Sequence, residues 1–212
     1  IIGKPGIGKT AACKHVLRDM EKYSDKVRGL YINCWKHDSS HKIMLNICEQ
    51  LNYKWVQNKN TNELLKEVSS ILNKKSVVIV LDEADKLKEE QIVYNLSEEL
   101  QKKCIIMIAN EKNFYSHLDD RTLSRLIPEM LEFESYSGKE TYDILEERKN
   151  IAFFDNVFGS ELLEPISEKT HEIGDIRTGL FLLKEAGNAP EIRSSRKVEE
   201  QDITKALNKV NS

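Results

Sequence analysis

The chain has 212 residues, with 32 lysines and arginines against 35 aspartates and glutamates, a formal net charge of −3 and a pI of about 6.0. This length is enough for one or two domains with a buried core. The near-neutral charge argues against binding nucleic acid by bulk charge alone, while it leaves room for a local basic patch. The longest apolar runs, 77–81 and 105–109, are far too short to cross a bilayer, so we expect no membrane partner.

The chain opens on Ile1 and Ile2, and a glycine-rich motif begins at Gly3. Such a motif needs a preceding strand, and strands run for about 5–6 residues. Because so short a stretch precedes the motif, and because the chain lacks an initiator Met, we expect it to be a fragment whose N-terminal part is missing.

Short apolar strands alternate with longer helical patterns along the first two thirds of the chain. Helices are predicted over 10–22, from a cap at Ser39 or Ser40 to Leu51, from a cap at Thr61 to Leu72, and over 92–102. Strands are predicted at the opening residues and over 30–34, 76–81 and 104–109. Because the last two strands are almost entirely apolar, they predict a parallel sheet covered by helices on both faces.

The pattern changes near Tyr136, after which no further strand is predicted. Ser137 and Glu140 form a capping box that opens a helix to about Lys149. The stretch 189–196 reads as a loop, and further helices are predicted over 162–170, 176–185 and 198–210. We therefore predict an α/β domain over 1–136, with a parallel sheet flanked by helices, and a small all-helical domain over 137–212.

The opening motif fits the phosphate-binding pattern G-x-x-x-x-G-K-[ST] without deviation, and it has apolar residues before it and a helical pattern after it. In this pattern glycines let backbone N–H groups turn toward phosphates, and the positive end of the following helix adds to the attraction. Lys9 is expected to reach the β- and γ-phosphates, and the Thr10 hydroxyl to ligate Mg²⁺. The predicted nucleotide-binding residues of the motif are Gly3, Lys4, Pro5, Gly6, Ile7, Gly8, Lys9 and Thr10.

Two predicted strands deliver polar side chains to the edge of the sheet where α/β proteins bind ligands. The strand over 77–81 ends in Asp82 and Glu83. Asp82 is predicted to hold the Mg²⁺ shell and Glu83 to orient or polarise the attacking water, because phosphoryl transfer needs positioning and charge neutralisation. The strand over 105–109 ends in Asn110, which is predicted to hold that water or touch the γ-phosphate, with a plain turn-forming role as the alternative.

Three arginines are candidates for stabilising charge on the transferring phosphate, which is what an arginine finger does. Arg177 stands at a helix start in the all-helical part, and Arg121 and Arg125 follow the strand that ends in Asn110. The alternative for each of them is a solvated or salt-bridged surface side chain.

Histidines and cysteines do not indicate a metal site. The five histidines are scattered without ligand spacing beside a carboxylate. The four cysteines, Cys13, Cys34, Cys48 and Cys104, show no CxxC spacing, and three of them sit in apolar surroundings, which is typical of free buried thiols.

The whole set of motifs resembles the AAA+ ATPases. The segments that carry this resemblance are GKPGIGKT at 3–10, VVIVLDEADKL at 77–87, IIMIAN at 105–110, LDDRTLSRL at 118–126 and GDIRTGL at 174–180. Within that superfamily the chain is most similar to the archaeal and eukaryotic origin-recognition and cell-division-control replication initiators. The matches that point there are YINC at 31–34, YNL at 94–96 and YDILEER at 142–148.

The resemblance implies an AAA+ fold whose all-helical part is the lid. It assigns residues 3–10 to Walker A, Asp82 with Glu83 to Walker B, Asn110 to sensor 1 and Arg177 to sensor 2.

A trans-acting arginine finger is also implied by the resemblance. Ser124-Arg125-Leu126 looks like the box that carries the finger in initiators and clamp loaders, although many archaeal initiators have Ser-Ser-Leu there. Whether Arg125 or Arg121 would act stays open. The family also carries an adenine-pocket segment before Walker A and a winged-helix DNA-binding domain after the lid, both expected to lie outside residues 1–212.

The function implied by the resemblance is an ATP-binding, slowly hydrolysing module that switches origin binding or helicase loading. Its cofactors would be ATP or ADP with Mg²⁺, and its partners other AAA+ subunits, the replicative helicase and, through the winged-helix domain, DNA. A cytoplasmic, nucleoid-associated protein is expected, or a nuclear one in a eukaryote. One alternative is another AAA+ machine, such as a clamp-loader subunit or an archaeal regulatory ATPase. The other is a scaffold that never turns its nucleotide over, against which Glu83 and Asn110 argue.

Overall fold

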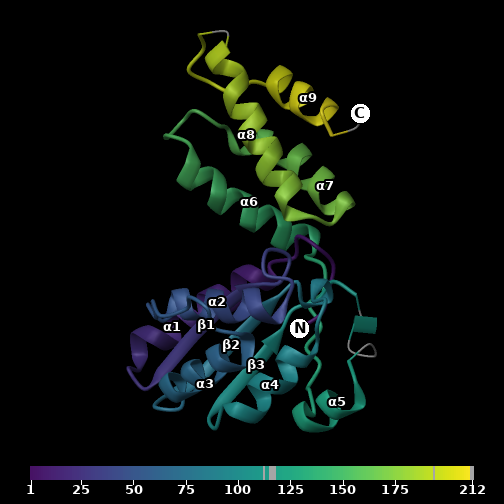
Figure 1. The fold of residues 1–212 in the computed structure, drawn as a ribbon. Coiled ribbons are helices and arrows are strands. Elements are labelled where there is room, and N and C mark those ends of the chain that lie inside the picture. The colour runs from purple at the N-terminus through teal and green to yellow at the C-terminus, as the bar shows by residue number, and fades with distance from the viewer. Residues whose placement is uncertain (112, 115–117, 193, 211–212) are drawn as a thin grey trace. The chain divides into compact units, whose positions relative to one another are not determined.

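The computed structural model describes the chain except for residues 112, 115–117, 193, 211 and 212. The chain divides into two compact units, residues 1–4 with 8–133 and residues 5–7 with 134–212. The first unit carries a parallel sheet flanked by helices, and the described part of the second is helical, which confirms the predicted fold class (Figure 1). Nowhere in the described chain does a helix have the length and apolar character needed to cross a membrane.

The first unit alternates helices and strands as the sequence pattern predicts. Its elements in chain order are α1 (Lys9–Tyr23), β1 (Val27–Asn33), α2 (Ser40–Gln50), α3 (Thr61–Leu72), β2 (Ser76–Asp82), the 3₁₀ turn η1 (Ala84–Lys86), α4 (Gln91–Glu99), β3 (Lys103–Met107) and α5 (Asp120–Leu126). The largest differences from the predicted bounds in this unit, of three residues each, are at two places. The strand expected over 30–34 begins at Val27, and the helix expected over 92–102 ends at Glu99 because buried Leu100 has an extended backbone.

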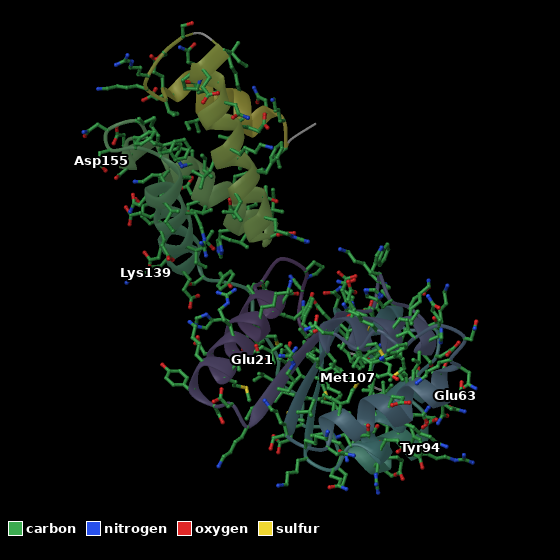
Figure 2. All side chains as sticks on the ribbon, turned by 60° about the vertical axis from the view of Figure 1, so that its left-hand side comes forward. Glu21, Glu63, Tyr94, Met107, Lys139 and Asp155 are labelled. Carbon is green, nitrogen blue, oxygen red and sulfur yellow. The ribbon has the colours of Figure 1, made fainter. Side chains whose placement is uncertain are left out.

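The described strands form a parallel sheet in the order β1-β2-β3, in which Tyr31 stands opposite Val80. Alternate residues of β2 face opposite sides of this sheet. Ile79 and Leu81 pack with residues of α2, α3 and α4, whereas Val78 and Val80 pack with residues of α1. Both faces are therefore covered, as the continuous apolar strands predict. Figure 2 draws these side chains, with Met107 labelled on β3 and Tyr94 on α4.

The predicted opening strand is reduced to isolated bridges at Ile2, which is parallel to Ala109 on one side and to Glu132 on the other. The N–H of Ile2 donates to the Leu131 carbonyl at 2.9 Å, and the N–H of Phe133 donates to the Ile2 carbonyl at 2.8 Å. The opening residues thus lie between the end of the β3 segment and residues 131–133, and they lead directly into the glycine-rich loop.

Capping side chains set where several helices begin. Of the two predicted caps for α2, Ser39 is the one that the structure shows. The cap of α3 is Asn60 and not Thr61, because the Asn60 side chain accepts from the Glu63 N–H at 3.0 Å while the Glu63 carboxylate accepts from the Asn60 N–H at 2.7 Å. This capping box satisfies two N–H groups at once, which leaves Thr61 as the first residue of the helix.

The second unit is a bundle whose elements are α6 (Gly138–Ala152), the 3₁₀ turn η3 (Ser160–Leu162), α7 (Glu164–Ile173), α8 (Ile176–Ile192) and α9 (Glu200–Asn208). The predicted capping box of Ser137 and Glu140 opens α6. The helices α6, α7 and α8 meet at Gly179, where an added Cβ would lie 2.6 Å from Leu145 and 2.7 Å from Thr170. Glycine at this position therefore permits the close packing of the three helices.

The predicted loop over 189–196 is wrong for its first residues, because α8 continues through Pro190 to Ile192. Proline normally breaks a helix, since it has no N–H and its ring meets the carbonyl of the preceding turn. Here Pro190 lies in the last turn, where its ring is buried and its carbonyl accepts from the Ser195 N–H at 2.9 Å. Burial of the ring offsets the lost helical bond.

Candidate functional site

The loop over 3–10 joins the opening residues to the first turn of α1. Gly6 and Gly8 have φ angles of 78° and 88°, in the left-handed region that glycine adopts without steric cost. Gly8 is the N-cap of α1, so the helix begins at Lys9. The first N–H groups of a helix lack partners within it, and they form a natural anion site at its positive end. Two left-handed glycines followed at once by a helix start are features that a phosphate-binding loop requires.

Lys9 lies at the carboxyl edge of the sheet with 6% of its surface exposed. Its Nζ donates to the carbonyl oxygens of Gly3 and Lys4 at 2.6 and 2.7 Å, and to Oδ1 of Asn110 at 3.0 Å. The loop thus curls around its own lysine, and the residue that follows β3 contacts the same ammonium. The structure in this way brings Lys9 and Asn110 together, although 101 positions separate them in the chain.

Asp82 ends β2 and is 3% exposed. Its Oδ2 accepts hydrogen bonds from the Thr10 hydroxyl at 2.7 Å and from the Tyr31 hydroxyl at 2.6 Å. Its Oδ1 accepts from the Glu83 N–H at 3.0 Å. Thr10 belongs to the first turn of α1, so this carboxylate joins the end of the strand to the start of the helix.

Glu83 follows directly, with φ 55° and ψ 45° in the left-handed region. A residue other than glycine, asparagine or aspartate seldom adopts this conformation, and such strain gathers at functional sites. The next N–H, of Ala84, donates to the Ile108 carbonyl at 2.8 Å and ties the turn to the segment after β3. The turn is therefore held by its neighbours while the half-buried Glu83 side chain stands beside Asp82.

Negative charge gathers at this end of the sheet. Burial, followed by the charges of Asp82, Glu83 and Asp85, raises the pKa of the Cys34 thiol to about 12. Burial and the hydrogen bond to Asp82 likewise raise the pKa of Tyr31, so its phenol keeps its proton at neutral pH and donates it to the carboxylate. The acidic residues would attract a cation and the Lys9 ammonium an anion, so this edge of the sheet suits a cation and an anion bound next to each other.

The donor chemistry fits Mg²⁺. The Thr10 hydroxyl and the Asp82 carboxylate are hard oxygen ligands that already lie 2.7 Å apart. No group of three or more His, Cys, Asp or Glu residues able to hold a metal occurs in the described chain. Magnesium is usually held by one or two protein ligands together with phosphates and water, rather than by an all-protein cage. The two oxygen donors next to a phosphate loop meet that requirement.

The two candidate arginines of the first unit, Arg121 and Arg125, make none of the contacts described above. Arg125 on α5 forms an ion pair with Glu98 of α4 at 2.8 Å, and both side chains are about half exposed. Arg121 is exposed in the first turn of the same helix. In the second unit, Nε of Arg177 donates to both carboxylate oxygens of Asp175, at 2.9 and 3.0 Å. Arg125 and Arg177 thus each form an ion pair with a nearby carboxylate.

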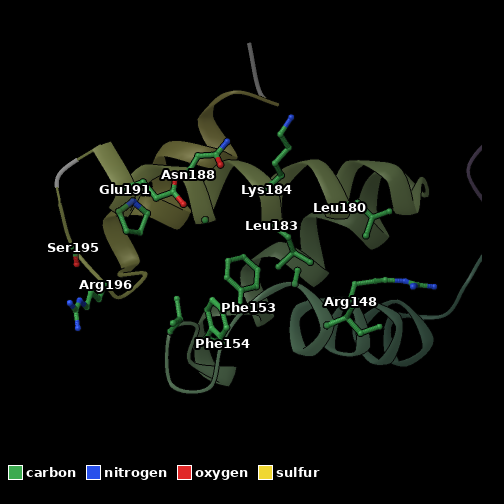
Figure 3. A pocket seen from close by; sticks show the side chains of 15 residues that line it. Arg148, Phe153, Phe154, Leu180, Leu183, Lys184, Asn188, Glu191, Ser195 and Arg196 are labelled. Atoms are coloured by element: carbon green, nitrogen blue, oxygen red, sulfur yellow. The ribbon is translucent and has the colours of Figure 1, made fainter.

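The second unit also holds a surface groove of about 740 Å³ between the end of α6 and α8 (Figure 3). Its lining includes Phe153, Leu183 and Gly187, with Arg148 and Lys184 also around it. An added Cβ at Gly187 would lie 2.7 Å from the Phe153 ring, so that ring packs directly on the helix backbone. None of the predicted site residues lines this groove.

Two family models match this chain, each mainly within one of the two units. A family model for an AAA domain matches residues 1–114, and a model for the Cdc6 AAA+ ATPase-type lid domain matches residues 142–208. The chain belongs to the ORC1/Cdc6 family of AAA+ ATPases. The lid match favours this family over the clamp-loader and regulatory ATPase alternatives.

Relatives of this ORC1/Cdc6-family chain are longer than it is. The ORC1-type DNA replication protein 1 of Archaeoglobus fulgidus is 32% identical over 231 residues, which cover 99% of this chain and 55% of that protein. The ORC1-type protein of Pyrococcus horikoshii is 31% identical with the same coverage. The solved structure of the Aeropyrum pernix ORC1 protein in complex with DNA has a TM-score of 0.85 at 26% identity, over 99% of this chain and 58% of that one. The chain thus spans about half the length of the curated relatives it matches.

The sequence patterns do not single out Tyr31 as a site residue in this ORC1/Cdc6-family chain. Tyr31 stands out only as part of the YINC stretch at 31–34, yet its hydroxyl donates to the same Oδ2 of Asp82 as the Thr10 hydroxyl does. A signal exists, because Tyr31 stands opposite Val80 and therefore points to the same face as Asp82, two residues further along β2. Predicting this contact requires the register of β1 against β2, which the sequence pattern does not supply.

Proposed function

We propose that this chain is the nucleotide-binding AAA+ module of a DNA replication initiator, which binds ATP or ADP with Mg²⁺ and hydrolyses ATP slowly. The observation that carries the proposal is the convergence of Lys9, Thr10, Asp82 and Asn110 at one edge of the sheet. These residues come from the phosphate loop, α1 and the ends of two strands, which is the arrangement that phosphoryl transfer by P-loop proteins requires.

Each residue has a role that follows from its chemistry. The backbone N–H groups of residues 6–10 and the Lys9 ammonium bind the phosphates. Thr10 and Asp82 would hold a magnesium ion, which would neutralise charge on the phosphates. Glu83 accepts a proton from the attacking water or orients it, and Asn110 holds that water or contacts the γ-phosphate. The Lys9–Asn110 bond of 3.0 Å supports this last role, because it places the amide next to the group that binds phosphate.

Slow turnover suits a switch rather than metabolic chemistry. A nucleotide changes a protein's conformation only by binding its states with different affinity, so ATP and ADP forms can differ in their contacts with DNA or a helicase. The relatives are named ORC1-type DNA replication proteins, and the Aeropyrum pernix ORC1 structure contains DNA. We infer origin DNA, other AAA+ subunits and the replicative helicase as partners of the whole protein.

The arginines are proposed to act from two sides, Arg177 within its own chain and Arg125, or Arg121, on a neighbouring subunit. Arg177→Ala is then expected to weaken ADP binding by a dilute chain by about 10-fold or more, the scale of one charged hydrogen bond, and it also leaves the Asp175 carboxylate without its bidentate partner. Arg125→Ala is expected to leave that affinity within about 2-fold, since it removes an exposed ion pair with Glu98. Titration with a fluorescent ADP analogue measures both.

Arg148→Ala is the matched control for the lid, because Arg148 is also an exposed arginine of the second unit and is given no part in nucleotide binding. A loss of ADP affinity in Arg125→Ala together with none in Arg177→Ala would reject both arginine assignments.

DNA binding by this chain alone is expected to be weak. The chain has a net charge of −3, and basic side chains such as Lys42 and Lys88 are paired with an acid, here Asp38. We expect a Kd for duplex origin DNA at physiological salt no tighter than the non-specific range of about 10⁻⁴–10⁻⁶ M. An anisotropy titration against origin and scrambled duplexes tests this. Tight and sequence-selective binding by the 212-residue chain would show that the α/β unit itself reads bases.

A further inference from the structure

The Tyr31 hydroxyl donates to Oδ2 of Asp82 at 2.6 Å, and the Thr10 hydroxyl donates to the same oxygen at 2.7 Å. Both distances are in the range of strong hydrogen bonds to a charged oxygen. Tyr31 reaches Asp82 diagonally from the neighbouring strand, since its direct partner across the sheet is Val80. An aromatic side chain is long enough to bridge that diagonal.

Tyr31 is itself held on several sides. The side chain of Gln50, the last residue of α2, accepts from the Tyr31 N–H at 3.2 Å and donates to the Tyr31 carbonyl at 2.9 Å. This primary amide thus pairs with β1 as a neighbouring strand would. The Lys14 ammonium lies 4.1 Å from the centre of the Tyr31 ring. Backbone and ring are therefore fixed before the hydroxyl meets Asp82.

The Asp82 carboxylate has its plane set by these donors. Thr10 and Tyr31 hold Oδ2, and the Glu83 N–H holds Oδ1 at 3.0 Å. Removal of the phenol hydroxyl leaves the carboxylate freer to rotate about its Cβ–Cγ bond. The Thr10 hydroxyl, which donates to the same oxygen, then loses its fixed direction as well.

We propose that Tyr31 is a positioning residue for magnesium, which acts by fixing the Asp82 carboxylate and, through it, the Thr10 hydroxyl. This inference rests on the proposed function, since it assumes that Thr10 and Asp82 hold Mg²⁺ beside a nucleotide. Magnesium demands near-ideal octahedral geometry, so it is sensitive to small rotations of its oxygen ligands. Groups that orient metal ligands from behind typically contribute 10–100-fold in metal affinity.

The test is the Mg²⁺ dependence of ADP binding in the parent chain and in Tyr31→Phe, which keeps the ring and removes only the hydroxyl. A fluorescent ADP analogue is titrated in EDTA and at increasing Mg²⁺. We expect Tyr31→Phe to raise the half-saturating Mg²⁺ concentration about 10-fold, while its Kd for ADP in EDTA stays within about 2-fold of the parent. Mn²⁺ binding to the ADP complex, followed by electron paramagnetic resonance, should weaken in the same variant.

Tyr53→Phe is the matched control, because it removes a hydroxyl that accepts from the Lys59 ammonium at 2.6 Å, and the partly buried Tyr53 packs against the core on the other face of the sheet. An unchanged Mg²⁺ requirement in Tyr31→Phe overturns the proposal. So does an equal loss of affinity in EDTA and in Mg²⁺, which would indicate a structural role. A parent chain that binds no ADP at all overturns the proposed function together with this inference.

If Tyr31→Phe does not fold, Gln50→Ala replaces it, since it keeps the hydroxyl and frees the Tyr31 backbone. A smaller rise in the Mg²⁺ requirement, about 2- to 5-fold, is then expected. An unchanged requirement in Gln50→Ala overturns the proposal in that case.

Discussion

Lys9→Ala is expected to weaken nucleotide binding by about 100-fold or more while the chain stays folded. The ammonium of Lys9 is held by the carbonyls of Gly3 and Lys4 at the loop that would bind phosphate. A hydrogen bond to a charged group contributes about 1.5–3 kcal/mol, and the Lys9 ammonium would make two such bonds if it contacts two phosphates. Each 1.4 kcal/mol is a factor of about ten in Kd, which gives the expected loss.

Titration with a fluorescent ADP analogue measures this loss, and thermal unfolding reports whether the variant is folded. Lys22→Ala is the matched control, because Lys22 lies on the same helix with an exposed side chain paired with Asp19. Equal affinity in Lys9→Ala and the parent would remove the phosphate-loop assignment.

Glu83→Gln is expected to bind ATP as the parent does and to hydrolyse it about 100-fold more slowly or worse, the usual scale for a positioned general base. The substitution keeps the shape of the side chain and removes its ability to take a proton. The turn itself should persist, because two hydrogen bonds from backbone N–H groups remain. The N–H of residue 83 still donates to the Asp82 carboxylate, and the N–H of Ala84 still donates to the Ile108 carbonyl.

A single-turnover assay with protein in excess over radiolabelled ATP suits the low rate that is expected. Glu99→Gln, at the exposed end of α4, serves as the control for the loss of a carboxylate in the same unit. Turnover in Glu83→Gln equal to the parent, both above background, would make Glu83 a structural residue whose left-handed backbone serves the turn alone.

The sheet and the main contacts of the site follow from local patterns in the sequence. Continuous apolar strands at 76–81 and 104–109 predict a buried parallel sheet, and polar residues directly after them must gather at its carboxyl edge. The Lys9–Asn110 and Thr10–Asp82 contacts are consequences of that topology. They are predictable because residue order along a strand fixes which residue emerges at which edge.

Contacts that depend on register or on competition between neighbours are not predictable in this way. Tyr31 reaches Asp82 only in the observed pairing of β1 with β2, and Gln50 holds Tyr31 only because α2 ends beside β1. Asn60 and Thr61 are both good caps, and the choice between them depends on the reciprocal bond with Glu63.

Tertiary packing also decides features that local propensity does not predict. Pro190 continues α8 instead of ending it, since its ring is buried in the last turn of the helix. Similarly, the partner of Arg125 is Glu98 on α4, which no spacing rule connects to it. Each of these features requires knowledge of which elements lie side by side.

The most direct test of the account is a crystal structure of this chain grown with ADP and Mg²⁺. The account predicts the β-phosphate within hydrogen-bond distance of the Lys9 ammonium and of backbone N–H groups of residues 6–10. It also predicts the metal ion bound at the Thr10 hydroxyl, with the Asp82 carboxylate still held by Tyr31. A nucleotide bound elsewhere would contradict the account. So would phosphates bound at this loop with a metal ion that contacts neither Thr10 nor a ligand held by Asp82.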